Sequence, residues 1–139
     1  MIVEQVWTGN AYRNFNYLVA CAESGEALAI DPLEFRKCLD VAQERGWTIT
    51  QILNTHEHAD HTGGNKGVVN ATGAKIIAHK DAGKRIPNMD RGVGAGDIIK
   101  VDGGMTAQQR SATVDIVPPD TFPRLEDVVA ALDTGAGGE

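Results

Sequence analysis

The stretch THEHADHTGGN, residues 55–65, carries three of the chain's four histidines and a carboxylate between them. Neutral imidazole and carboxylate groups are the usual protein ligands of zinc and related divalent metals. His56 and His58 stand two positions apart, so in an extended loop both side chains point the same way and can reach one ion. Asp60 and His61 follow on a turning backbone and can reach a second position nearby. The stretch therefore predicts a metal-binding site.

Two glycines follow the predicted ligands. We expect Gly63 and Gly64 to let the backbone turn sharply before the next helix. The alternative is a solvated, histidine-containing loop with a helix cap, but the density of ligand side chains favours the metal site. His79, the remaining histidine, stands at a predicted strand end, where a structural or surface role is favoured over ligation. Zinc is the expected ion, in one or two copies, and the ligand types also fit iron or manganese.

The sequence on either side of this stretch predicts strands and helices in alternation. Short runs rich in Val, Ile, Leu and aromatic residues predict strands at residues 1–7, 17–22, 27–30, 48–53, 75–78 and 97–101. Apolar residues at helical spacing, with glycine behind them, predict helices at residues 32–45 and 65–72. Between the last strands we predict a helical turn at 81–85 and a loop at 87–96. This order indicates a mixed α/β fold with helices between sheet strands.

The pattern changes after Val101, which divides the chain into residues 1–101 and a divergent tail, residues 102–139. The tail begins with a polar, Gly-containing segment, and residues 112–117 are predicted to form a strand. Residues 123–132 are predicted to form an amphipathic helix, whose apolar face carries Leu125, Val128, Val129 and Leu132.

Composition excludes several classes of function. The chain has 139 residues, enough for one domain, and a net charge of −6, which disfavours nucleic acid as a partner. No apolar run approaches the roughly 20 residues needed to span a bilayer, so no membrane partner is expected. Two cysteines, Cys21 and Cys38, are too few for a disulfide framework, and a cytoplasmic location is expected.

The metal-binding stretch resembles the signature of the metallo-β-lactamase superfamily, in the form found in glyoxalase II (hydroxyacylglutathione hydrolase) and its thioesterase relatives. Four other segments resemble family segments in the same order: NFNYLV at 14–19, AIDP at 29–32, IIAH at 76–79 and GDIIKV at 96–101. The resemblance runs from Met1 to Val101. It implies an αββα sandwich of which residues 1–101 supply only the first half.

The resemblance also implies roles for individual residues. His56 and His58 would hold a first metal ion, and Asp60 and His61 a second, with Asp60 also counted as the catalytic residue. A water activated by the cations would attack a thioester or ester carbonyl of a small substrate. Asp31 would support the metal loop from beneath, although a role as N-cap of the following helix remains open.

The chain departs from the family's pattern beyond His79. The family takes a third histidine from a Thr-Pro-Gly-His turn, a bridging aspartate and a last histidine from its second half, and no histidine follows His79 here. Catalytic zinc normally holds three protein ligands, so the site is incomplete and we expect little or no turnover. Codons for residues 117–123 permit Thr-Pro-Gly-His-Val-Pro in a shifted frame; a naturally divergent tail is the equal alternative.

Three functions from different classes follow. The first is a metal-dependent thioesterase; the second is a non-catalytic, truncated metal-binding half-domain. The third is a self-associating module, expected as a homodimer, because half a sandwich leaves apolar sheet surface to cover. Lactonases, β-lactamases and persulfide dioxygenases share the histidine motif, so the substrate stays open.

Overall fold

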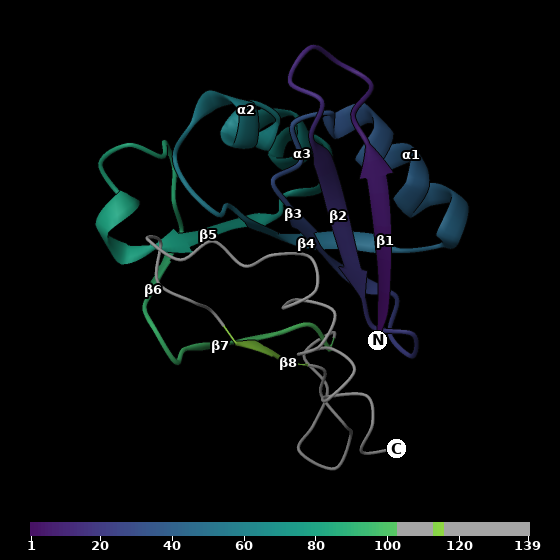
Figure 1. Ribbon diagram of the computed structural model, residues 1–139. Helices are drawn as coiled ribbons and strands as arrows, with labels where there is room; N and C mark the ends of the chain where they lie inside the picture. The colour runs from purple at the N-terminus through teal and green to yellow at the C-terminus, as the bar shows by residue number, and fades with distance from the viewer. Residues whose placement is uncertain (103–112, 116–139) are drawn as a thin grey trace.

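The computed structural model describes residues 1–102 and 113–115, the last three by their backbone (Figure 1). The strands are β1 (Ile2–Trp7), β2 (Phe15–Ala20), β3 (Glu26–Ile30), β4 (Thr48–Leu53), β5 (Lys75–His79), β6 (Arg91–Val93), β7 (Ile98–Lys100) and β8 (Thr113–Asp115). The helices are α1 (Phe35–Arg45), α2 (Ala59–Thr62) and α3 (Asn65–Thr72), with the short 3-10 helix η1 (Lys80–Ala82). This is the mixed α/β arrangement that the sequence predicts.

Six strands form one sheet in the order β1-β2-β3-β4-β5-β6. The pairs β1–β2 and β2–β3 are antiparallel, whereas β3, β4, β5 and β6 run parallel. The carboxyl ends of parallel strands lie at one edge of a sheet, where open α/β folds place their functional loops. Asp31 follows β3 and residues 55–64 follow β4, so the sheet brings these two segments to the same edge.

The sheet is covered differently on its two faces. Helices α1 and α3 pack on one face, above a buried cluster that includes Leu18, Ile52 and Val68 (Figure 1). The strands β7 and β8 form a separate two-stranded sheet on the side away from these helices. Ile99, in β7, and Val101 are both fully buried among the side chains of the second face. Residues 98–101 therefore contribute to covering this face.

The second face is more completely buried than half a sandwich leads one to expect. Its members are at most 7% exposed: Val19, Leu28, Ile30, Leu53, Ile77 and Val93. The large apolar side chains that remain exposed lie elsewhere: Ile2, Trp7, Tyr12, Phe15 and Ile98. The predicted tail helix at residues 123–132 lies outside the described residues. On the described strands, the apolar surface that half a sandwich was expected to leave partly uncovered is therefore buried.

Helix α1 begins at Phe35, three residues later than predicted. Asp31 has a left-handed backbone, with φ of 47°, and its carbonyl accepts a hydrogen bond from Leu33 N at 2.7 Å. Side-chain Oδ1 of Asn16 then accepts from Glu34 N at 2.9 Å. These contacts hold residues 31–34 in a turn, so Pro32 precedes the helix rather than opening it. The helix ends as predicted, with Gly46 in a left-handed conformation.

Strand β6 lies within the segment predicted to be a loop. It has three residues, pairs in parallel with β5, and contains Gly92. A Cβ at Gly92 would lie 2.9 Å from Lys80 Cα, so glycine permits the close approach of the two segments. Such a short strand carries no readable alternation, which explains why the prediction missed it.

Cys21 and Cys38 are both buried and free. Burial raises the pKa of the Cys38 thiol to about 12, so this group stays protonated. Among the described residues, none of the helices has the length and apolar character required to cross a bilayer.

Candidate metal centre

The predicted ligands come from two kinds of local structure. His56 and His58 lie on the irregular segment after β4, and His58 has an extended backbone (φ −61°, ψ 145°). Helix α2 begins directly after it, so Asp60 and His61 stand on a helical turn. The segment was predicted to be a loop throughout, and its second half is helical instead. This change of backbone turns the Asp60 side chain back toward the preceding histidines.

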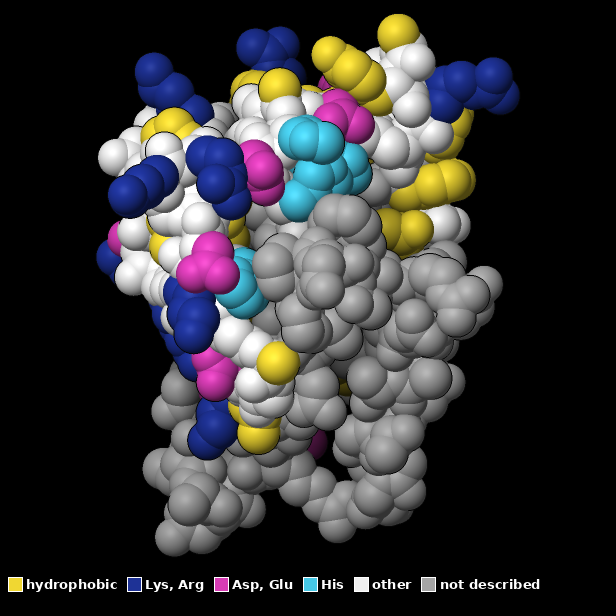
Figure 2. All heavy atoms as spheres, turned by 60° about the vertical axis from the view of Figure 1, so that its left-hand side comes forward, with side chains coloured by type: hydrophobic (Ala, Val, Ile, Leu, Met, Phe, Trp, Pro, Cys, Tyr) yellow, Lys and Arg dark blue, Asp and Glu magenta, His cyan; other side chains and the backbone are white. Residues whose placement is uncertain are grey.

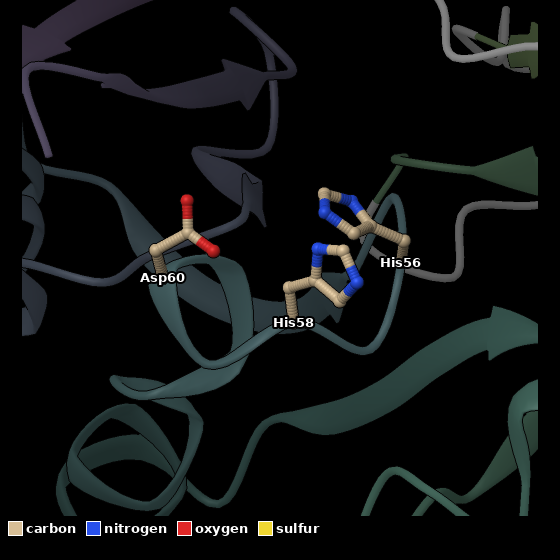
Figure 3. Close-up of side chains that lie close together, drawn as sticks. All are labelled: His56, His58 and Asp60. Carbon is tan, nitrogen blue, oxygen red and sulfur yellow. The ribbon is translucent and has the colours of Figure 1, made fainter.

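Three of the predicted ligands come together in space. His56, His58 and Asp60 each offer one ligand atom, and these atoms lie within 4.8 Å of one another (Figure 3). The His56 and His58 rings meet edge to face, with centroids 4.6 Å apart. His58 is exposed and the other two are half-buried. Histidine side chains gather at the surface beside acidic groups, where an ion from solvent can reach them (Figure 2).

His61 lies next to this group. Its ring centroid is 4.0 Å from that of His56, and its Nε2 is 3.2 Å from Asp60 Oδ2. Two ligands of a tetrahedral zinc ion, each about 2.0 Å from the metal, lie about 3.3 Å apart. The separation of His61 Nε2 and Asp60 Oδ2 is close to this distance. His61 thus contacts both His56, ring to ring, and the Asp60 carboxylate.

Asp31 forms the floor of the site. Its Oδ1 accepts a hydrogen bond from Thr55 N at 2.9 Å, and its Oδ2 accepts from Thr55 Oγ1 at 2.7 Å. The same Oδ2 lies 2.8 Å from His61 Nδ1. Asp31 is only 6% exposed, and the N-cap of α1 is Glu34, without a side-chain bond. Asp31 thus supports the metal loop, and its proposed role as N-cap is wrong.

The pKa values of His61 and His56 shift in opposite directions. The hydrogen bond that His61 Nδ1 donates to Asp31 raises the pKa of His61 above its ordinary value. Burial, followed by the nearby His61, lowers the pKa of His56. Since metals bind neutral imidazole, the lowered pKa keeps His56 in its binding form. The Asp31 contact sets His61 Nδ1 as the N–H donor and directs Nε2 toward Asp60.

The glycines behind the ligands act through space rather than through unusual backbone angles. Gly63 and Gly64 form the predicted turn between α2 and α3, but both have right-handed conformations (φ −59° and −94°) that other residues also adopt. A Cβ at Gly64 would lie 1.8 Å from Pro32 O and 2.7 Å from Leu33 O. Only glycine permits the loop to lie this close to the turn after β3. The ligand loop therefore packs directly against the turn after β3.

His79 lies outside the ligand group. Its Nδ1 accepts a hydrogen bond from Asp81 N at 3.1 Å and caps η1. Within the described part of the chain, the group of His56, His58 and Asp60 is the one cluster with the geometry of a metal site. The structural role predicted for His79 agrees with its capping contact.

Comparison with known families agrees with the family resemblance of the metal-binding stretch. The profile of the metallo-β-lactamase superfamily matches residues 17–137. The chain belongs to the metallo-β-lactamase superfamily. The match begins in β2 and continues past Val101. It therefore covers the ligand loop, residues 55–64, and most of the tail.

Two relatives of this superfamily member are named hydroxyacylglutathione hydrolase. The protein of Polaromonas sp. is 70% identical over 101 residues, which are 73% of this chain and 38% of the relative. The protein of Nitrosococcus oceani is 58% identical over 105 residues, 76% of this chain and 40% of the relative. The chain therefore spans about two fifths of the length of these relatives and is glyoxalase II-like over that part.

A solved structure shares the fold. The crystal structure of ETHE1 from Myxococcus xanthus matches with a TM-score of 0.65 and 26% identity, covering 73% of this chain and 44% of that one. The predicted fold class, a metallo-β-lactamase-like α/β fold of which only part is present, is confirmed.

Sequence reasoning missed two polar residues at the ends of the ligand loop. Asn54 follows β4 and Asn65 opens α3; both are buried and bonded to each other. Asn14 was missed as well, and its Nδ2 donates to the carbonyl of Asp60 at 3.0 Å. For Asn54 and Asn65 the one signal in the sequence is their position, because they flank the histidine motif directly.

Proposed function

We propose that the chain binds a divalent transition-metal ion through His56, His58 and Asp60, with His61 as a further ligand beside Asp60. The observation that supports this most is the convergence of three ligand atoms within 4.8 Å on one short segment. The buried Asp31 beneath the loop supports it as well, since metal-binding histidines commonly donate their second N–H to a carboxylate. The donor set suits zinc, and iron or manganese also fit it.

The bound ion would supply Lewis-acid chemistry and an activated water for hydrolysis. The chain's own residues orient the donors. Asp31 fixes the ring of His61 through Nδ1, and the α2 turn presents the Asp60 carboxylate to both His61 and the histidine pair. We assign Asp60 the catalytic role predicted from the sequence because it is the one carboxylate within this group.

The reaction proposed is hydrolysis of a small thioester or ester, of the hydroxyacylglutathione type named for the relatives. In this chain by itself we expect the reaction to be very weak or absent. Four clustered donors give fewer protein ligands than two catalytic metal ions normally hold. A loosely held ion positions its water poorly, and small misplacements cost large factors in rate.

Metal binding is tested by titrating the metal-stripped protein with Co²⁺ and recording its d–d absorption. The native chain should bind with a defined stoichiometry, and His58→Ala should abolish or strongly weaken binding. His79→Ala is the matched control, because that imidazole caps η1 away from the group. Equal binding by all three proteins, or no binding by the native chain, would show the assignment to be wrong.

Catalysis is tested by hydrolysis of S-lactoylglutathione by the zinc-loaded chain. We expect a rate close to that of free zinc. Robust turnover that His58→Ala abolishes would show that the chain completes its site from other residues or from a second copy.

The alternative function is a non-catalytic metal-binding half-domain that self-associates, with a homodimer as the simplest form. Exposed aromatic side chains favour this: Trp7 is 45% and Phe15 40% exposed, and their rings pack 4.8 Å apart. Exposed apolar patches of this kind promote association. Sedimentation at micromolar concentration should show a dimer that Trp7→Ser dissociates, and a monomer would reject it. The cytoplasmic location stays a prediction, supported by the two free cysteines.

A further inference from the structure

Two buried amides lie beneath the two ends of the ligand loop. Asn54 is 2% and Asn65 7% exposed, and between them run residues 55–64 with all four predicted ligands. Asn65 Nδ2 donates to Asn54 Oδ1 at 2.6 Å, and Asn54 Nδ2 donates to Asn65 Oδ1 at 3.1 Å. Each amide therefore gives and accepts one hydrogen bond in a closed pair.

A third contact fixes the direction of this pair. Asn54 Nδ2 also donates to the carbonyl of His61 at 3.2 Å. A backbone carbonyl only accepts, so the side of Asn54 that faces His61 must be its NH₂ group. Its Oδ1 then faces the NH₂ of Asn65. Both hydrogens of Asn54 Nδ2 are used, and one arrangement of the two amides satisfies all three bonds.

Each amide is anchored in a different element. Asn54 N donates to Ile77 O at 3.0 Å, which extends the pairing between β4 and β5 by one residue. Asn65 is the first residue of α3, and this helix packs against β4 and α1. The pair thus connects a strand end with a helix start and closes the loop between them.

We infer that Asn54 and Asn65 form an amide clasp that positions the metal-binding loop. This inference rests on the proposed metal binding. His61 is held twice: the clasp holds its carbonyl, and Asp31 holds its ring. Without the clasp, the α2 turn can shift relative to the strand end, and Asp60 loses its place beside His56 and His58. Groups that orient metal ligands commonly contribute about 10- to 100-fold to affinity.

The experiment compares two destabilising substitutions of buried residues. Asn65→Leu breaks the clasp, whereas Ile49→Ala truncates a buried side chain near the start of β4, at the end of the strand away from the loop. Both should lower the midpoint of urea unfolding. Only Asn65→Leu should weaken Co²⁺ binding by at least about tenfold. A second variant, Asn65→Asp, keeps size and suits a helix start, yet sets a carboxylate against Asn54 Oδ1.

Amide hydrogen exchange of the metal-free proteins supplies a readout independent of metal. Breaking the clasp should speed exchange at residues 55–62 and leave β1 and β2 unchanged, and Ile49→Ala should not speed exchange at residues 55–62. Native-like Co²⁺ affinity in a folded Asn65 variant would overturn the inference. If the native chain binds no Co²⁺, the proposed function fails, and unchanged loop exchange in the Asn65 variants would then overturn the clasp separately.

Discussion

Two parts of the candidate metal site differ in how their polar groups are satisfied. The floor consists of the buried residues beneath the ligand loop, Asp31 and Asn54, and the rim consists of the loop's exposed side, with His58 and Asp60. On the floor, Asp31 is 6% and Asn54 2% exposed, and their side chains hold the loop's backbone and the His61 ring at several points. On the rim, His58 is exposed and Asp60 half-buried, with their ligand atoms directed toward a shared space (Figure 3). The polar groups of the floor are hydrogen-bonded within the protein, whereas the ligand atoms of the rim converge where an ion could bind them.

This difference separates stability from function. A buried polar group that loses its partner costs the folded state free energy, whereas an exposed imidazole costs little when removed. We therefore expect floor substitutions to reduce both folding stability and metal affinity, and rim substitutions to reduce affinity alone.

The largest effect is expected for Gly64→Ala. The new Cβ would meet Pro32 O at 1.8 Å, so the ligand loop and the turn after β3 would have to separate. We expect a loss of about 3 kcal/mol or more in the free energy of unfolding, measured by urea denaturation. Gly94→Ala is the control, because nothing lies within 4 Å of its added Cβ. Equal stability of the two variants would contradict the close approach.

Asp31→Ala should come next. It removes the acceptor of Thr55 N, Thr55 Oγ1 and His61 Nδ1, which we expect to cost about 2–4 kcal/mol of unfolding free energy. Metal affinity should fall about 10- to 100-fold in a Co²⁺ titration. Asp40→Ala, an exposed change on α1, should leave both within error. A stable Asp31→Ala protein with native affinity would remove the distinction between floor and rim.

A smaller effect concerns pH and the link between floor and rim. Asp31 raises the pKa of His61 in the folded state, so the protonated ring stabilises the metal-free protein. This contribution is complete below the unfolded pKa of about 6.5 and is lost as pH rises through the folded value. The stability difference between the native chain and His61→Gln, measured in EDTA, should therefore shrink between pH 5.5 and pH 8.5. A difference that grows with pH would reverse the sign.

The smallest effect is expected for Arg85→Ala. Arg85 Nε lies 3.1 Å from Glu57 Oε1 at the rim, and the arginine side chain is 56% exposed. Exposed ion pairs contribute about 0–1 kcal/mol, so stability should stay nearly unchanged. Co²⁺ affinity should change less than threefold, about 0.6 kcal/mol. A tenfold loss would show that the rim is held by Glu57 as well as by the floor.

The rim could be predicted from the sequence because its information is local. Ligand type and spacing within residues 56–61 were enough to bring His56, His58 and Asp60 into one group. Helix ends at Gly46 and Gly73 were predictable for the same reason, since a left-handed glycine after a helix is a local signal.

The floor could be predicted only in part because its contacts join distant segments. Asp31 and Thr55 are 24 positions apart, and their bond depends on β3 and β4 running parallel. Asn54 and Asn65 pair only once α3 docks on the sheet. The close approach of Gly64 to Pro32 likewise needs the assembled fold, which is why glycine was assigned a turn rather than a contact.

The account depends on metal binding at the rim, and anomalous diffraction tests this most directly. Crystals of the chain grown with Zn²⁺ would be measured on both sides of the zinc absorption edge. We predict an anomalous peak within bonding distance of His56, His58 and Asp60, above an Asp31 that still bonds Thr55 and His61. No peak at these three side chains in crystals whose loop is ordered, or a peak only at His79, would contradict the account.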